Sequence, residues 1–238
     1  MSRAPRIAVT EDDFRGVPTV IDRYLRRALP IGTVPSSIQI RHEGTFLLNG
    51  TWRTFRSTER FSVEPRGFLW EARIRVAPGV DVFVRDSSIG GIGSMQAAVG
   101  GIYSVMSQRG GDLLAAGALQ RYLAEASWLP AALLPRYGVA WEGIDETRAR
   151  GTLVEGGTSV SLEFRFDADG DVTYVYSPSR PREFKGGYAP TPWGGRSWNY
   201  QDRCGMRIPL ESEVEWIVDG ARQPYFRGRI VNVACDAM

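Results

Sequence analysis

Three ionisable side chains lie on faces of predicted strands that are otherwise apolar. Glu59 lies between Phe55 and Phe61 in an alternating segment, and Asp86 and His42 continue apolar runs of the same kind. An unpaired charge is costly to bury, so each group needs a partner or a hydrated cavity. Two interpretations follow. Either the strands end here or arginines pair with the acids, or the three groups supply acid–base chemistry in a pocket.

A second set of polar residues lies on a predicted helix. Arg121, Glu125 and Trp128 are spaced i, i+4 and i+7, so they share one helical face. The first two could form a surface ion pair that contributes about 0.3 kcal/mol. The tryptophan that completes the stripe indicates contact with the interior or with a ligand. The candidate catalytic residues are Glu59, Asp86, Arg121 and Glu125, of which the arginine would stabilise negative charge.

Aromatic residues are frequent, with seven tryptophans in 238 residues. Trp70 has the inward parity of its predicted strand, which also suits a packing role. Trp193 lies in a segment rich in glycine and proline, and aromatic side chains that a loop presents at a cavity mouth commonly line ligand sites. The candidate ligand-binding residues are His42, Trp70, Trp128, Trp193 and Tyr200.

Several kinds of chemistry are excluded by the sequence. It has no phosphate-binding loop, dinucleotide fingerprint, nucleophile elbow or zinc-protease helix. One histidine and two distant cysteines predict no metal site, and no cofactor is expected. With 29 basic and 27 acidic residues the net charge is only +2, which predicts no nucleic-acid partner.

The elements that must position these residues are mainly strands. Apolar and polar residues alternate in short runs from Ser36 to about Gln108 and again from Val160 to Tyr176, with turn signals such as Asn49-Gly50 between runs. This pattern is typical of an antiparallel sheet. The Pro-, Gly-, Ser- and Arg-rich segment 178–195 is predicted to be a loop.

Two helical segments complete the predicted fold. Apolar residues at helical spacing from Val17 to Leu29 predict a surface helix, and residues 112–134 predict a second one, broken at Pro130. A sheet of this length must curl to bury its apolar face. We therefore predict a mainly β (α+β) single domain over residues 1–238: a large curved antiparallel sheet or half-barrel with an N-terminal helix and a central helical lid. Its shape resembles that of lipoprotein-carrier half-barrels.

The chain is expected to be cytoplasmic. No apolar stretch follows the N-terminal charges, so no signal peptide is expected. No segment approaches the roughly 20 apolar residues that a membrane span needs, so no integral membrane segment is expected. In the reducing cytoplasm, Cys204 and Cys235 are predicted to be free thiols.

The segment Arg121–Pro135 resembles the signature of a bacterial family of unknown function, which runs Arg-Tyr-Leu-x-Glu-x-x-Trp-[Phe]-Pro-[Thr]-Ala-Leu-Leu-Pro. Leu129 and Ala131 stand where that signature has Phe and Thr, and Glu59 stands where a glutamine is more usual. Further matching segments include Arg23-Tyr24-Leu25-Arg26, Gly67-Phe68-x-Trp70-x-Ala72, Val84-x-Asp86, Pro192-Trp193, Tyr200 and Glu213-Val214-x-Trp216. The resemblance implies homology and brings no assigned activity.

The predicted fold indicates a function in small-molecule binding. The first hypothesis is that an enclosed cavity binds a hydrophobic small molecule or lipid-like metabolite. The alternative is a cofactor-independent cyclase, isomerase or hydrolase that acts on such a molecule by acid–base catalysis. A structural or interaction module would have no cavity. The discriminating observation is whether the four candidate catalytic residues converge on one pocket.

Overall fold

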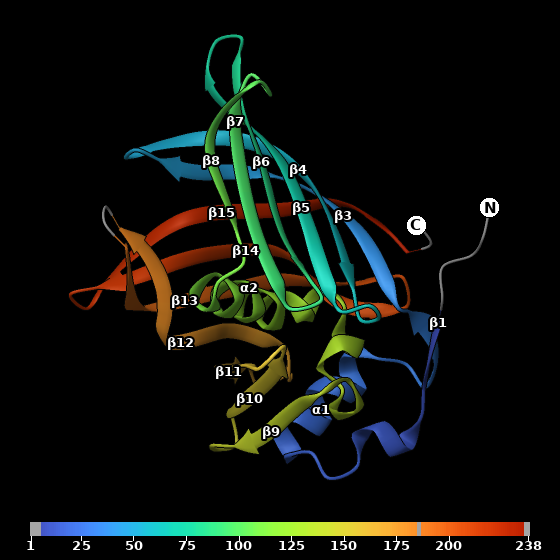
Figure 1. Cartoon of the computed structure of the whole chain (residues 1–238). Helices are drawn as coiled ribbons and strands as arrows, with labels where there is room; N and C mark the ends of the chain where they lie inside the picture. Colours follow the sequence, from blue (N-terminus) through green and yellow to red (C-terminus); the bar gives the residue numbers. More distant parts are fainter. Residues whose placement is uncertain (1–5, 185–186, 236–238) are drawn as a thin grey trace.

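The computed structural model describes residues 6–184 and 187–235, and one curved sheet dominates them (Figure 1). The strands are β1 (Arg6–Val9), β2 (Gly32–Pro35), β3 (Ser37–Leu48), β4 (Thr51–Ser62), β5 (Gly67–Ala77), β6 (Val80–Ile89), β7 (Ile92–Val99), β8 (Tyr103–Arg109), β9 (Val139–Gly143), β10 (Arg148–Glu155), β11 (Thr158–Phe166), β12 (Val172–Phe184), β13 (Gly187–Arg203), β14 (Met206–Val218) and β15 (Ala221–Ala234). The helices are α1 (Thr19–Ala28) and α2 (Asp112–Glu125), with short 3₁₀ segments η1 (Glu11–Phe14), η2 (Ala126–Trp128), η3 (Pro130–Leu133) and η4 (Pro135–Tyr137).

The sheet consists of two meanders joined at its centre. Thirteen strands of the described chain follow the order β8-β7-β6-β5-β4-β3-β15-β14-β13-β12-β11-β10-β9, and each neighbouring pair is antiparallel. The first and last long strands meet in the middle, where His42 of β3 lies opposite Ile230 of β15. The two edge strands, β8 and β9, flank the central helical segment in sequence. The predicted antiparallel half-barrel is confirmed.

The inward faces are the ones that alternation predicts. Ile40, Phe61, Trp70 and Phe164 are each at most 5% exposed, while their sequence neighbours alternate toward solvent. The turn signals also lie where expected: Asn49 and Gly50 both have positive φ, +48° and +75°, in the tight turn between β3 and β4. This turn suits the right-handed twist of the paired strands. Burial and turn chemistry thus agree on one register.

Helix α2 lies inside the curve of the sheet (Figure 1). It packs against β6 and β7 from one meander and against β10, β11 and β12 from the other. Tyr122 and Leu123 are its most buried large side chains, and the Tyr122 ring stacks on Phe61 of β4 with centroids 4.6 Å apart. The helix therefore closes the concave side, as the predicted lid does.

Helix α1 closes one end of the sheet. Its apolar stripe, which includes Val20, Ile21 and Leu25, is buried, and the ring of Tyr24 lies 5.7 Å from that of Phe166 on β11. The helix packs against β9, β10 and β14. The predicted N-terminal helix is confirmed, with its polar face outward.

In the segment predicted as a loop, residues 178–195, the described residues 178–184 and 187–195 are instead paired strand, and residues 185–186 lie outside the described residues. The first part belongs to β12 and the second to β13, with Pro181 opposite Pro190 and Ser177 opposite Trp193. A proline lacks the N–H that a central strand position needs. The prolines of residues 178–195 therefore predicted a loop. In the structure, Pro181 and Pro190 lie directly opposite each other. The pairing of β12 with β13 shifts its register between Ser177 and Arg180.

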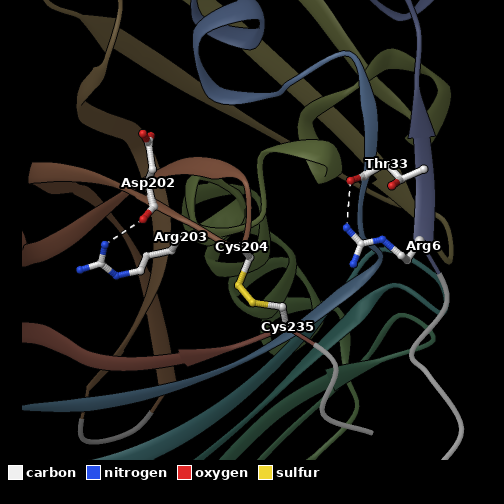
Figure 2. The surroundings of a disulfide bond; sticks show 6 residues. All are labelled: Arg6, Thr33, Asp202, Arg203, Cys204 and Cys235. Atoms are coloured by element: carbon white, nitrogen blue, oxygen red, sulfur yellow. Dashed lines mark hydrogen bonds between the residues drawn. A yellow bond between two sulfur atoms is a disulfide. The ribbon is translucent and has the colours of Figure 1, made fainter.

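The prediction of free thiols is wrong for this structure. Cys204 and Cys235 form a disulfide with their Cα atoms 5.9 Å apart (Figure 2). Cys204 lies in the turn between β13 and β14, and Cys235 follows the end of β15, so the bond ties the last strand to an adjoining turn. Residues 31 apart in sequence meet only through this sheet, which spacing alone does not reveal. The cytoplasmic location from which free thiols follow stays a prediction.

Among the described residues, none of the helices has the length and apolar composition needed to cross a lipid bilayer.

Candidate functional site

Arg121 of α2 lies at the centre of a cluster of three carboxylates. Its guanidinium donates to Asp86 at 2.6 Å, to Glu125 at 2.8 Å and to Glu59 at 3.4 Å. It also lies over the aromatic ring of Phe68, with Cζ 4.5 Å from the centroid. All four candidate catalytic residues of the sequence therefore come together, at one guanidinium.

The sheet register brings the acids to this point. Glu59 on β4 lies directly opposite Trp70 on β5, and Trp70 lies directly opposite Asp86 on β6. Directly opposite residues of neighbouring strands share a face, so these three form one inward row. The guanidinium of Arg121 lies 5.3 Å from the ring of Trp70 in the middle of this row. Glu125 joins from one turn further along α2.

Burial controls the charge of this cluster. The side chain of Glu59 is fully buried, and among the described residues no donor reaches Oε2 of Glu59 or of Glu125. Burial, then repulsion by Glu125, raises the pKa of Glu59 well above its ordinary value, and burial also raises the pKa of Glu125. Burial opposes the charged form of Arg121, but the three carboxylates outweigh it and raise its pKa. The cluster therefore favours a protonated Glu59 beside a permanent cation.

Such a cluster has a defined chemical capability. A carboxyl group that keeps its proton near neutral pH can donate a hydrogen bond or a proton to a bound molecule. Arg121 can stabilise negative charge, although it already has three acceptors. Within residues 6–184 and 187–235, no three His, Cys, Asp or Glu residues are grouped to hold a metal ion.

The cluster opens onto a cavity of about 970 Å³ between the curved sheet and α2. Both meanders and the helix contribute its walls, which are mainly apolar. Of the nine predicted site residues, seven line it: Glu59, Trp70, Asp86, Arg121, Glu125, Trp128 and Trp193. The convergence that distinguishes a cavity protein from an interaction module is therefore present.

His42 and Tyr200, the other two predicted site residues, lie outside this cavity. The His42 ring packs 5.0 Å from that of Trp128, and its Nδ1 lies 3.4 Å from Ser57 Oγ. Burial, and then Arg121, lower the pKa of His42 to about 3, so the ring is neutral and supports the wall behind Trp128. Tyr200 donates its hydroxyl to the backbone oxygen of Val172 at 2.8 Å.

Alternation predicted strands at Val214 to Val218 and at Tyr225 to Val233, and Trp193 was a predicted ligand-binding residue, but the sequence did not show that they form one wall of the cavity. Trp193 lines the cavity from β13 and donates its indole N–H to the hydroxyl of Tyr225 at 2.9 Å. Trp216 stacks on Tyr225 with centroids 5.9 Å apart, and Arg180 lies over Trp193. The inward parity of Trp216 was a usable signal. Arg180 had none, because a predicted loop has no parity.

Comparison with known proteins identifies a family and several similar folds. A model described as "Family of unknown function (DUF6920)" matches residues 15–234, which confirms the expected likeness to a family without an assigned function. A search of curated proteins finds no significant match.

Three solved structures are similar to this chain. A LolA superfamily protein from Nitrosomonas europaea is 10% identical, with a TM-score of 0.49, covering 92% of this chain and 93% of that one. A putative outer membrane lipoprotein-sorting protein domain from Vibrio parahaemolyticus is 9% identical, with a TM-score of 0.46 and coverage of 84% and 85%. A beta-barrel-like protein of a domain of unknown function from Brucella abortus is 11% identical, with a TM-score of 0.31 and coverage of 84% and 97%.

Proposed function

The chain belongs to the family of unknown function DUF6920, and we propose that it binds an apolar, lipid-like small molecule between the curved sheet and α2. The observation that carries this proposal is the cavity of about 970 Å³. Its volume lies near the upper end of the range of roughly 300–1,000 Å³ that is usual for small-molecule sites. Protein interiors are otherwise close-packed, so a space of this size between the sheet and α2 favours a site for a bound molecule.

The lining of the cavity favours an apolar occupant. Aliphatic and aromatic side chains come from every wall: Phe46, Leu48, Ile74, Val76, Val82, Met95, Met106, Leu114, Val175, Val214, Trp216 and Phe226. Transfer of apolar surface from water into such a site contributes about 25 cal/mol per Å². The polar lining includes the Arg121 cluster and Arg180, together with Asn49, Arg53, Gln108, Arg182, Glu183 and Arg196. Polar groups in a mainly apolar site can orient a molecule that is otherwise held by its apolar surface.

A cavity-filling substitution tests this function. Gly117 of α2 lines the cavity, and a Cβ built on it meets no atom within 4 Å. An alanine methyl therefore fits at this position, Gly117→Phe extends a ring from it into the binding volume, and Gly117→Ala is the matched control. We expect the neutral probe N-phenyl-1-naphthylamine to bind the wild type and the Ala variant, and to bind the Phe variant at least about tenfold more weakly, a change of roughly 1.4 kcal/mol.

The folded state should tolerate both substitutions. Replacing a helical glycine by alanine stabilises a helix by about 0.5–1 kcal/mol, so neither variant should melt below the wild type. Equal affinity of the probe for the wild type and the Gly117→Phe variant would contradict binding in this cavity.

A second candidate function is a cofactor-independent reaction, such as isomerisation, cyclisation or hydrolysis, of the bound molecule. The observation that favours it is Glu59, whose raised pKa and position on the cavity wall suit a general acid. This function predicts that Glu59→Gln retains binding of a substrate and abolishes its turnover. Retained turnover in that variant would exclude Glu59 as the acid.

A further inference from the structure

Arg180 of β12 lines the cavity, as Arg121 does, but its contacts differ from those of Arg121. Its guanidinium lies over the indole of Trp193, with Cζ 4.7 Å from the ring centroid. Its Nη1 is buried and has no hydrogen-bond partner among residues 6–184 and 187–235. In the part of the chain that the structure describes, no carboxylate forms an ion pair with Arg180, whereas three contact Arg121.

The neighbouring acids do not supply the missing counter-ion. Asp86 and Glu125 are near enough to influence Arg180, but their direct contacts are with Arg121. Burial lowers the pKa of Arg180, which is the cost of holding a cation out of water without a partner. A guanidinium keeps its charge at neutral pH because its ordinary pKa is above 12. The cavity thus has an uncompensated cation in an apolar wall.

We propose that Arg180 binds the carboxylate of a long-chain monocarboxylic acid whose hydrocarbon chain occupies the cavity. This inference rests on the proposed function and names the class of ligand. A carboxylate is planar, accepts hydrogen bonds only, and matches the two parallel N–H groups of a guanidinium. The guanidinium lies over Trp193, Trp216 lies opposite Trp193 on β14, and Val214 and Phe226 line the same cavity.

The charge at the site favours a monoanion over a larger anionic group. Arg180 is one cation, the next arginine of β12 (Arg182) lies over Trp216, and the neighbouring cluster holds three acids around Arg121. A phosphate dianion or a nucleotide would bring its second negative charge toward these acids. A fatty acid brings a single charge and leaves the remainder of the molecule apolar.

Competition with a neutral probe tests this inference. N-Phenyl-1-naphthylamine is displaced with laurate, 1-dodecanol and dodecyl phosphate from the wild type, Arg180→Met and the control Arg229→Met, an exposed arginine of β15. We expect the wild type to bind laurate at least about tenfold more tightly than dodecanol, because one charge-assisted hydrogen bond produces an affinity ratio of about this size. In Arg180→Met this ratio should fall to about one through weaker laurate binding, and Arg229→Met should retain the wild-type ratio.

Stability measurements separate this role from a structural one. Because Arg180 has no ion-pair partner in the described chain, Arg180→Met should unfold, without ligand, at a temperature no lower than the wild type. Arg180→Gln provides a second, polar variant with the same expected loss of laurate preference. A lower unfolding temperature in both variants would overturn the proposal that the cation awaits a ligand.

The remaining outcomes identify which proposal fails. Equal binding of laurate and dodecanol to the wild type would overturn the carboxylate assignment and leave apolar binding intact. Tighter binding of dodecyl phosphate than of laurate would assign a phosphate headgroup instead and also overturn it. Loss of laurate preference in Arg182→Met, but not in Arg180→Met, would place the anion at the next arginine of β12. Binding of none of the three compounds would contradict the proposed function itself.

Discussion

At Glu59, burial and a neighbouring acid act in the same direction. The side chain is fully buried, no donor from the described chain reaches its Oε2, and Glu125 lies beside it on α2. The folded protein therefore retains a proton that the unfolded chain releases above its ordinary pKa of 4.5. Because the folded state then binds more protons, this group lowers the free energy of unfolding as pH rises above 4.5.

Glu59→Gln should remove that pH dependence. The amide keeps the shape and a donor but does not titrate, so the variant should match the wild type near pH 4. Above pH 4.5, its free energy of unfolding should exceed that of the wild type by up to about 1.4 kcal/mol more with each pH unit. This increase should stop at the pKa of Glu59 in the folded protein. Urea denaturation at pH 4, 5.5, 7 and 8 measures the difference. Glu71→Gln, at a site 53% exposed on the adjacent β5, serves as the control and should show no such trend. If the difference in free energy of unfolding between Glu59→Gln and the wild type did not change with pH, Glu59 would not be protonated in the folded protein.

The sequence predicted the acids at this site and did not predict their exact partners. Strand parity identified Glu59 and Asp86, and helical spacing placed Arg121 with Glu125, since each pattern is local. Which strand lies over which helix depends on long-range packing, so the three contacts of Arg121 could only be seen in the fold. Arg180 was missed because its strand contains prolines that predict a loop.

At the scale of elements, α2 combines a packing face with a cavity face. Leu123 is fully buried against the sheet, whereas Leu113, in the first turn of the helix, is 51% exposed and lines the cavity. The place of α2 between β8 and β9 in the chain was predictable, because a segment with helical spacing separates two regions in which apolar and polar residues alternate. Its position across both meanders was not, because periodicity does not say how far a sheet curls.

Two alanine substitutions on α2 should separate stability from binding. Leu123→Ala leaves a void in the core and should lower the free energy of unfolding by about 2–5 kcal/mol. Leu113→Ala should change that free energy by less than about 0.5 kcal/mol. It should weaken binding of N-phenyl-1-naphthylamine by roughly threefold to tenfold, through lost apolar contact. Denaturation and fluorescence titration measure the two effects, and the reverse assignment of the two leucines would show that the helix faces are misidentified.

At the scale of the whole molecule, the disulfide secures the end of β15. This strand forms half of the central β15–β3 pair, and Cys235 follows it directly (Figure 2). Loss of a crosslink between residues 31 apart should lower the free energy of unfolding by about 3–4 kcal/mol, on a chain-entropy estimate.

Thiol counting and denaturation of the oxidised protein check this expectation. Under denaturing conditions, Ellman's reagent should detect no thiol before reduction and two after it. Reduction, or the double variant Cys204→Ser with Cys235→Ser, should lower the unfolding midpoint, and the double variant should no longer respond to reductant. Two free thiols in protein purified from a reducing cytosol would agree with the predicted cytoplasmic location, and an unchanged midpoint would show that the crosslink contributes little.

The order of strands also sets when the cavity can exist. The β3–β8 meander and the β9–β15 meander each form from hairpins between neighbouring segments, whereas the β15–β3 pair closes nearly the whole chain into a loop. Contacts between segments so far apart in sequence form late, because closing a long loop costs more entropy than closing a hairpin. Among the described strands, β15 follows all the others in sequence, so a nascent chain that still lacks it carries the first meander without the wall that completes the cavity. An occupant can therefore be enclosed only after β15 has been synthesised, and a product truncated before β15 would expose that apolar face to chaperones instead.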